Sequence, residues 1–211
     1  MRILVIADDF WHPANVPMAG LERLSMMNVA FDWITDAQDW TADLMAQYPL
    51  TILTKSNNRS STDTEKWMTP AIEQAFVDYV SAGHGLIAIH SGTAGYQENM
   101  TLRALLGGVF LQHPPQCDVT IEPRGESLLT DGVTPFTVRD EHYHMAVDDP
   151  EAIVILTAKS IYGEQPAGWL RHEGQGKVAV LTPGHNLDVW MQPAYQLMIT
   201  HAIQHCAASA Q

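Results

Sequence analysis

Cysteine and basic residues are scarce in this chain of 211 residues. The two cysteines, Cys117 and Cys206, lie far apart and lack CxxC or zinc-site spacing, so we expect two reduced thiols rather than a disulfide. The chain has only 11 lysines and arginines but 24 acidic residues, which gives a net charge of −13. That charge disfavours nonspecific binding to nucleic acid or to an anionic membrane surface.

Long apolar runs are also missing. No run approaches the ~20 residues that a membrane-spanning helix requires. The first residues lead directly into a strand-like segment that ends at Asp8 and Asp9, unlike a signal peptide, so we expect a cytoplasmic protein. Since 46% of the residues are hydrophobic and no linker or repeat is evident, we expect residues 1–211 to form one domain. A homo-oligomer is left open.

Common catalytic motifs are absent from the sequence. There is no GxGxxG or P-loop to cradle a nucleotide phosphate, and no HExxH metal motif. Ser91 does not form a nucleophile elbow, because Ile89 stands where that motif has glycine. Neither cysteine follows a predicted parallel strand. A covalent mechanism therefore has no obvious nucleophile.

Apolar segments of strand length alternate with segments of helical periodicity along the chain. Strands are expected at 2–7, 29–34, 50–54, 85–89 and 153–156, an edge or antiparallel strand at 117–122, and a hairpin over 168–182 with its turn at 174–176. Helices are expected at 21–28, 40–48, 70–83, 100–106 and 193–205. This order predicts a three-layer α/β fold with a mostly parallel sheet and antiparallel additions.

Three histidines follow predicted strands. His12 lies after the first strand, His90 directly after the 85–89 strand, and His185 after the second strand of the hairpin. In an open parallel sheet the ligand crevice lies beyond the carboxyl ends of the strands. A single histidine in such a place is more often a hydrogen-bonded structural residue, but three at one edge indicate a functional site.

Loop residues supply further candidates for the same crevice. His113 precedes two prolines, and the segment 140–144 holds Asp140, Glu141 and Tyr143. If this segment is extended, Glu141 and Tyr143 share one face while His142 and His144 share the other, so only one of the two pairs faces the crevice. The aromatic side chains of Trp11 and Tyr96 flank the candidates and suit stacking on a sugar ring, although core packing is their default role.

The same residue types are compatible with a divalent metal. Imidazole and carboxylate groups ligate metals, and a histidine-rich site favours zinc. The candidate ligands are His90, His113, His185 and Glu141. Without a close-packed ligand motif, the sequence leaves acid–base catalysis and metal binding both open.

Several segments, taken in order, resemble the ThuA-like (trehalose utilisation) family. They are Gly85 to Gly92, Leu106 to Phe110 with His113-Pro114, Phe136 leading to Asp140-Glu141 and Tyr143, and Gly176 to Val178 followed by Gly184-His185. The resemblance covers nearly the whole chain and implies a flavodoxin-like fold related to the class I glutamine amidotransferases. Those relatives carry a cysteine nucleophile where this chain has His90, so glutamine amidotransferase activity is not expected.

The resemblance implies a role in carbohydrate metabolism. We expect an enzyme, such as a hydrolase, lyase or isomerase, that acts on a disaccharide or keto-sugar, with His90, His185 and Glu141 as its catalytic residues. The pocket is expected to be lined by His12, His113, Asp140, Tyr143, Trp11 and Tyr96. The alternative is a noncatalytic sugar-binding or interaction protein that kept the fold and lost the chemistry.

Overall fold

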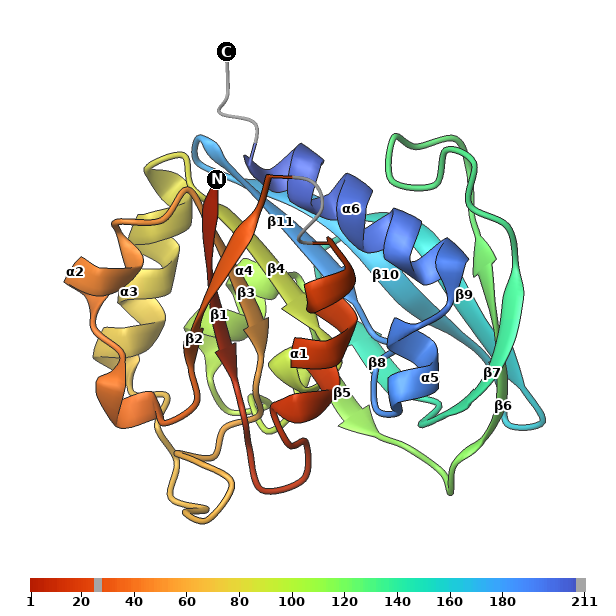
Figure 1. Ribbon diagram of the computed structural model, residues 1–211, viewed down its shortest axis with the longest axis horizontal. Helices are drawn as coiled ribbons and strands as arrows, with labels where there is room; N and C mark the ends of the chain where they lie inside the picture. The colour runs from red at the N-terminus through yellow and green to blue at the C-terminus, as the bar shows by residue number, and fades with distance from the viewer. Residues whose placement is uncertain (25–27, 208–211) are drawn as a thin grey trace.

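A nine-stranded sheet forms the centre of the protein in the computed structural model, which describes residues 1–24 and 28–207 (Figure 1). The strand order is β2-β1-β3-β4-β11-β10-β9-β6-β7. The parallel strands are β1 (Arg2–Ala7), β2 (Ala30–Ile34), β3 (Leu50–Thr54), β4 (Gly85–Ile89) and β11 (Gly176–Leu181). The antiparallel additions are β10 (Gly163–Glu173), β9 (Ile153–Ser160), β6 (Cys117–Pro123) and β7 (Phe136–Asp140).

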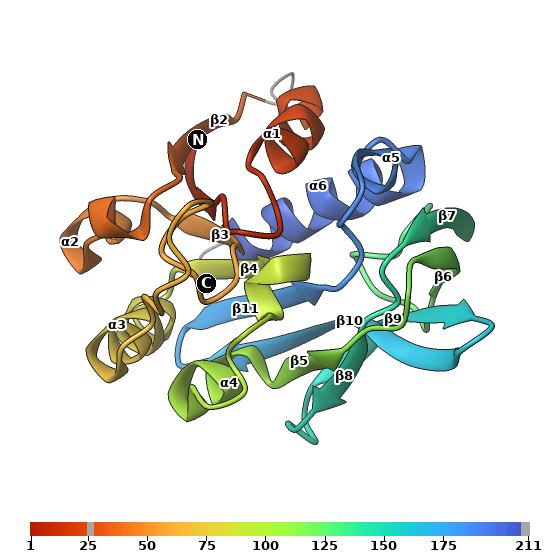
Figure 2. The same cartoon turned by 90° about the horizontal axis from the view of Figure 1, so that it is seen from below.

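Helices cover both faces of the sheet and complete a three-layer α/β architecture (Figure 2). One face carries α1 (Asn15–Glu22), α5 (Leu187–Trp190) and α6 (Pro193–Ala207). The other face carries α2 (Ala42–Met45), α3 (Pro70–Ser81) and α4 (Met100–Leu106). The described residues also include the short 3-10 helices η2 (Ala37–Asp39) and η3 (His90–Thr93). The expected fold class is confirmed.

The alternation of side chains along β1 explains the two cores. Ile3 and Val5 pack into the core beneath α1 and α6, whereas Leu4 and Ile6 pack into the core beneath α2, α3 and α4. All four side chains are buried because β1 lies between β2 and β3 and is covered on both faces. The carboxyl ends of the parallel strands consequently share one edge, where the site is built.

Two local predictions are confirmed. Thr69 caps α3, its hydroxyl oxygen accepting a hydrogen bond from the Ile72 amide at 3.3 Å, and proline occupies the first helical turn. The predicted hairpin is the antiparallel pair β10–β11, in which Glu173 lies opposite Gly176. On its other side β11 pairs parallel with β4, so the residues that follow these two strands are neighbours.

Other predictions need correction. The segment 40–48 does not form one helix, because Trp40 is extended and Thr41 begins a separate helix at Ala42 as its N-cap. By contrast, strand β6 satisfies the prediction of an edge or antiparallel strand, because it pairs antiparallel with β9 and β7 on its two sides. Part of the expected helix 21–28, including Ser25, lies outside the described residues.

Two further strands form a small second sheet. Strand β5 (Gly108–Gln112) pairs antiparallel with β8 (His144–Val147), which follows the Asp140–Tyr143 segment. The segment is therefore held on one side by β7, which pairs with β6, and on the other by β8, which pairs with β5. Within the described residues, no helix is both long and apolar enough to cross a membrane.

Candidate functional site

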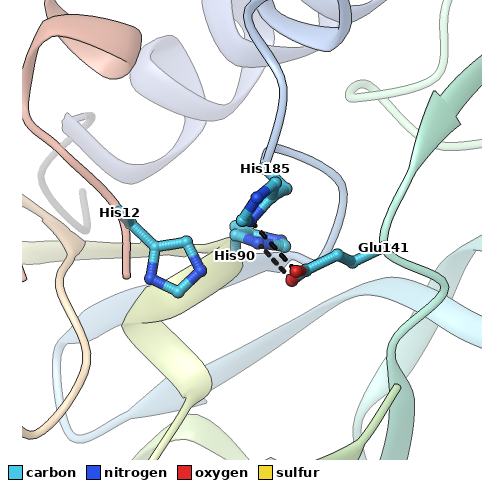
Figure 3. A group of neighbouring side chains, drawn as sticks. All are labelled: His12, His90, Glu141 and His185. Carbon is cyan, nitrogen blue, oxygen red and sulfur yellow. Dashed lines mark ion pairs between the residues drawn. The ribbon is translucent and has the colours of Figure 1, made fainter. Parts of the chain in front are cut away.

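Four side chains from separate parts of the chain meet at the carboxyl edge of the parallel strands (Figure 3). His12 follows β1, His90 follows β4, His185 follows β11, and Glu141 follows β7. One ligand-type atom from each residue lies within 4.8 Å of those of the other three. The convergence of the three strand-exit histidines, expected from the sequence, is present in the structure.

His90 occupies an unusual backbone conformation. Its φ of +48° lies in the left-handed region, which a residue with a Cβ adopts at a cost. Two residues later, Gly92 passes so close to β3 that a Cβ there would lie 2.0 Å from the Leu53 carbonyl oxygen. This sharp turn holds the imidazole at the end of β4, and backbone strain of this kind concentrates at functional sites.

The His90 ring is held in one orientation. Its Nδ1 lies 2.8 Å from the Thr182 carbonyl oxygen, and its face stacks on Tyr143 with 4.1 Å between ring centroids. Since a carbonyl oxygen only accepts, Nδ1 carries the proton and donates it to Thr182. The opposite nitrogen, Nε2, then points to Glu141, 3.4 Å from Oε2.

Glu141 is the hub of the cluster. Besides His90, its carboxylate lies 3.3 Å from Nδ1 of His185 and 3.5 Å from Nε2 of His113. Burial alone would raise the pKa of the Glu141 carboxyl, but its interactions with His185 and His90 outweigh burial and hold that pKa well below its usual value. Glu141 is therefore ionised throughout the neutral range.

His12 is oriented by a buried carboxylate that the sequence did not single out. Asp9 accepts from Nδ1 of His12 at 2.8 Å and from the amides of Trp11 at 2.9 Å and Ser56 at 2.8 Å. Burial opposes ionisation of Asp9, but the contact with His12 and these amides lowers its pKa to about 2. The only sequence signal was its position directly after the first strand.

Asp140 acts on the backbone of the His185 loop. Its oxygens accept from the amides of Gly184 at 2.9 Å and His185 at 3.0 Å, and burial raises the pKa of this carboxyl. At Gly184, whose φ is +146°, a Cβ would lie 3.1 Å from the Cβ of His90, so the loop packs directly on that residue. Asp140 is fully enclosed and does not line the pocket.

A pocket of about 700 Å³ opens above this cluster. Its size lies within the usual range for small-molecule sites. Aromatic side chains on its wall are Trp11, Phe110 and Tyr143, and its polar lining includes His12, Ser56, Asn57, Asn58, Lys66, His113, Glu141 and His185. The segment after β3 that supplies Ser56 to Asn58 was expected to be only a polar loop, although its place after a parallel strand could have marked it.

The other predicted site residues are placed differently. Tyr96 is fully buried, its hydroxyl donating to the Lys55 carbonyl at 2.7 Å, and it does not line the pocket. As expected for an extended segment, Glu141 and Tyr143 face the pocket together. His142 points away from it and contacts Ser160 Oγ at 2.6 Å.

Solved structures similar to this chain share its fold at low sequence identity. A ThuA-like protein from Parabacteroides merdae has a TM-score of 0.78 at 13% identity, covering 100% of this chain and 92% of that one. A cytoplasmic protein from Salmonella typhimurium has a TM-score of 0.67 at 17% identity, covering 98% and 97%. PurLQS from Thermotoga maritima has a TM-score of 0.62 at 16% identity, covering 97% and 98%. No curated protein sequence matches the chain.

The chain has a glutamine amidotransferase-like α/β fold in which a histidine stands at the turn after β4. The family model described as trehalose utilisation matches residues 2–206. The chain belongs to this family, ThuA, and the family indicates a role related to carbohydrates.

Proposed function

We propose that this protein is an enzyme of carbohydrate metabolism that converts a disaccharide or a keto-sugar at the His90, His185 and Glu141 centre. The observation that carries the proposal is the convergence of these three side chains at a pocket of about 700 Å³ with aromatic walls: His185 and Glu141 line the pocket, and His90 is buried beside them. Family membership supports the substrate class.

The imidazole and carboxylate groups of this centre suit the chemistry of sugars. Hydrolysis, elimination and isomerisation all require proton transfer at hydroxyl, carbonyl or adjacent C–H groups, and imidazole and carboxylate perform it near neutral pH. Tyr143 and Trp11 offer apolar surface to a sugar ring, while Lys66 and His113 add polar groups to the pocket lining. Trehalose and its keto derivatives are the first candidates.

The partner in this proposal is a small carbohydrate rather than nucleic acid or a membrane, in keeping with the net charge of −13. A cytoplasmic location is part of the same proposal and is supported by the Salmonella neighbour.

The test is product analysis after incubation with trehalose, other disaccharides and their keto derivatives. We expect one class to be converted by the wild type and by His172→Ala, which removes an exposed histidine outside the pocket. His90→Ala should fold, by circular dichroism, without converting it. Binding of a sugar without conversion would favour the alternative, a noncatalytic sugar-binding protein. Undiminished conversion by His90→Ala would remove that residue from the mechanism.

A further inference from the structure

We propose that His12, His90, His185 and Glu141 bind one divalent metal ion, with zinc the best match, and that Asp9 positions His12 for it. This inference deepens the proposed function: with the metal bound, His90, His185 and Glu141 act at the same centre as its ligands rather than as free acids or bases. It begins from geometry, because four potential ligand atoms from four segments lie within 4.8 Å of one another.

The hydrogen bonds of two histidines determine which nitrogen faces the centre. Nδ1 of His90 donates to the Thr182 carbonyl, and Nδ1 of His12 lies 2.8 Å from the Asp9 carboxylate, which accepts from it. In each neutral ring the remaining nitrogen, Nε2, therefore carries a lone pair. A fixed proton on one nitrogen and an exposed lone pair on the other is the arrangement found in metal-ligating histidines.

Two buried nitrogens at the centre lack a hydrogen bond. Nε2 of His90 and Nδ1 of His185 have no hydrogen-bond partner among the described residues, although both face the Glu141 carboxylate. His90 is only 1% exposed, so bulk water does not satisfy its nitrogen. Buried polar atoms are rarely left unpaired, and here two buried imidazole nitrogens converge on one carboxylate without a hydrogen bond. A cation between them satisfies the whole group.

The donor set selects the kind of metal. Three imidazoles and one carboxylate match the nitrogen and oxygen ligands of zinc and its four-coordinate preference. Magnesium and calcium prefer sites made of oxygen atoms. His113 lies beside Glu141 at 3.5 Å but outside the group of four, so we assign it to the pocket wall rather than to the metal.

Asp9 is the positioning residue of this centre. Its carboxylate contacts His12 from the side opposite Nε2 and is held in place by the amides of Trp11 and Ser56. Removing a carboxylate that orients a metal-binding histidine costs about 10–100-fold in metal affinity. We expect Asp9→Asn to show a loss of this size.

The chain offers a matched control for Asp9. Glu73 is also a buried carboxylate that accepts backbone amides, those of Thr101 and Leu102 at 2.9 Å, but no hydrogen bond or ion pair seen in the described residues joins it to a histidine. Glu73→Gln therefore perturbs a buried anion without reaching the proposed centre.

The experiment is titration of metal-stripped protein with zinc in competition with a chromophoric chelator, together with elemental analysis of the native protein. We expect one zinc per chain for the wild type, Glu73→Gln and His113→Ala, a loss of about 10–100-fold in affinity for Asp9→Asn, and no stoichiometric zinc for His12→Ala or His90→Ala. Cobalt substitution should give the absorption spectrum of a four-coordinate site, and circular dichroism checks that each variant is folded.

Failure of the wild type to bind zinc, cobalt, manganese or nickel in stoichiometric amount would overturn the metal centre. Wild-type affinity in folded Asp9→Asn would overturn the positioning role, and so would an equal loss in Glu73→Gln. Because these measurements contain no sugar, they are independent of the proposed function. A metal-free protein that converts a sugar would refute this inference alone, and a zinc protein that converts none would refute only the proposed function.

Discussion

Nδ1 of His90 lies 2.8 Å from the carbonyl oxygen of Thr182, which ties the residue after β4 to the residue after β11. The pairing of these two strands is parallel and places Ile89 opposite Leu181. The hydrogen bond to Thr182 sets the direction of the imidazole, so the orientation of His90 depends on the register between β4 and β11.

The left-handed backbone at His90 leads to a prediction about stability. In metal-free protein, His90→Gly should be more stable than His90→Ala by up to about 1 kcal/mol, because glycine avoids the cost of a positive φ while both variants lose the imidazole. Urea unfolding measures the difference. At Ala71, an exposed position in α3, the order should be reversed, with Ala71→Gly destabilising by about 1 kcal/mol. A more stable His90→Ala would contradict the strained turn.

The exposed indole of Trp11 leads to a prediction about sugar binding. Its side chain lines the pocket while 67% of the residue is exposed, so Trp11→Ala should weaken binding of the substrate sugar by several-fold to about tenfold and change stability by less than about 0.5 kcal/mol. Calorimetric titration measures the affinity. Ile161→Ala, at a residue 86% exposed in the β9–β10 turn, should leave affinity unchanged. Equal effects of both substitutions would argue against stacking on Trp11.

Lys55 leads to a prediction about pH. Its ammonium group is buried and donates to the Asp8 carbonyl, and burial lowers its pKa to about 8 from 10.5. Between these two values the unfolded chain binds more protons than the folded one, so stability should rise with pH across that window, by up to about 3 kcal/mol from this group. Below pH 8 Lys55 is protonated in both the folded and the unfolded chain, so it no longer makes the stability depend on pH.

The measurement is urea unfolding at pH 7.5 to 10.5 for the wild type and Lys55→Met. The difference between their pH profiles isolates Lys55 from the tyrosines and cysteines that titrate in the same range. Parallel profiles would show that the Lys55 pKa is not depressed in the folded protein.

The two cysteines should differ in reactivity. Both are free thiols, as the sequence predicted, but burial raises the pKa of Cys206 to about 12, whereas Cys117 is half-buried at the start of β6. At pH 8 a disulfide reagent such as Ellman's should modify Cys117 first and Cys206 only at the rate of unfolding. Cys117→Ser should remove the fast phase. Fast labelling in that variant would mean that α6 opens readily around Cys206.

The predictions for single segments succeeded where local chemistry decides the structure. The cap of α3 at Thr69 and the hairpin turn at Gly174–Gly176 were both predictable, because capping and turn formation involve residues near one another in the chain. The predicted helix 40–48 failed because apolar spacing does not reveal that Trp40 is extended.

The sequence by itself determined which residue types end the parallel strands, and hence that His12, His90 and His185 share one edge of the sheet. Periodicity and strand order suffice for that, because parallel strands deliver their carboxyl ends to the same side. Only the tertiary structure decided that Glu141 contacts two of these histidines, that Asp9 orients the third, and that Tyr96 and Asp140 are enclosed. Those relationships depend on contacts between segments distant in the chain, such as the pairing of β6 with β9 and of β5 with β8, which local sequence patterns do not encode.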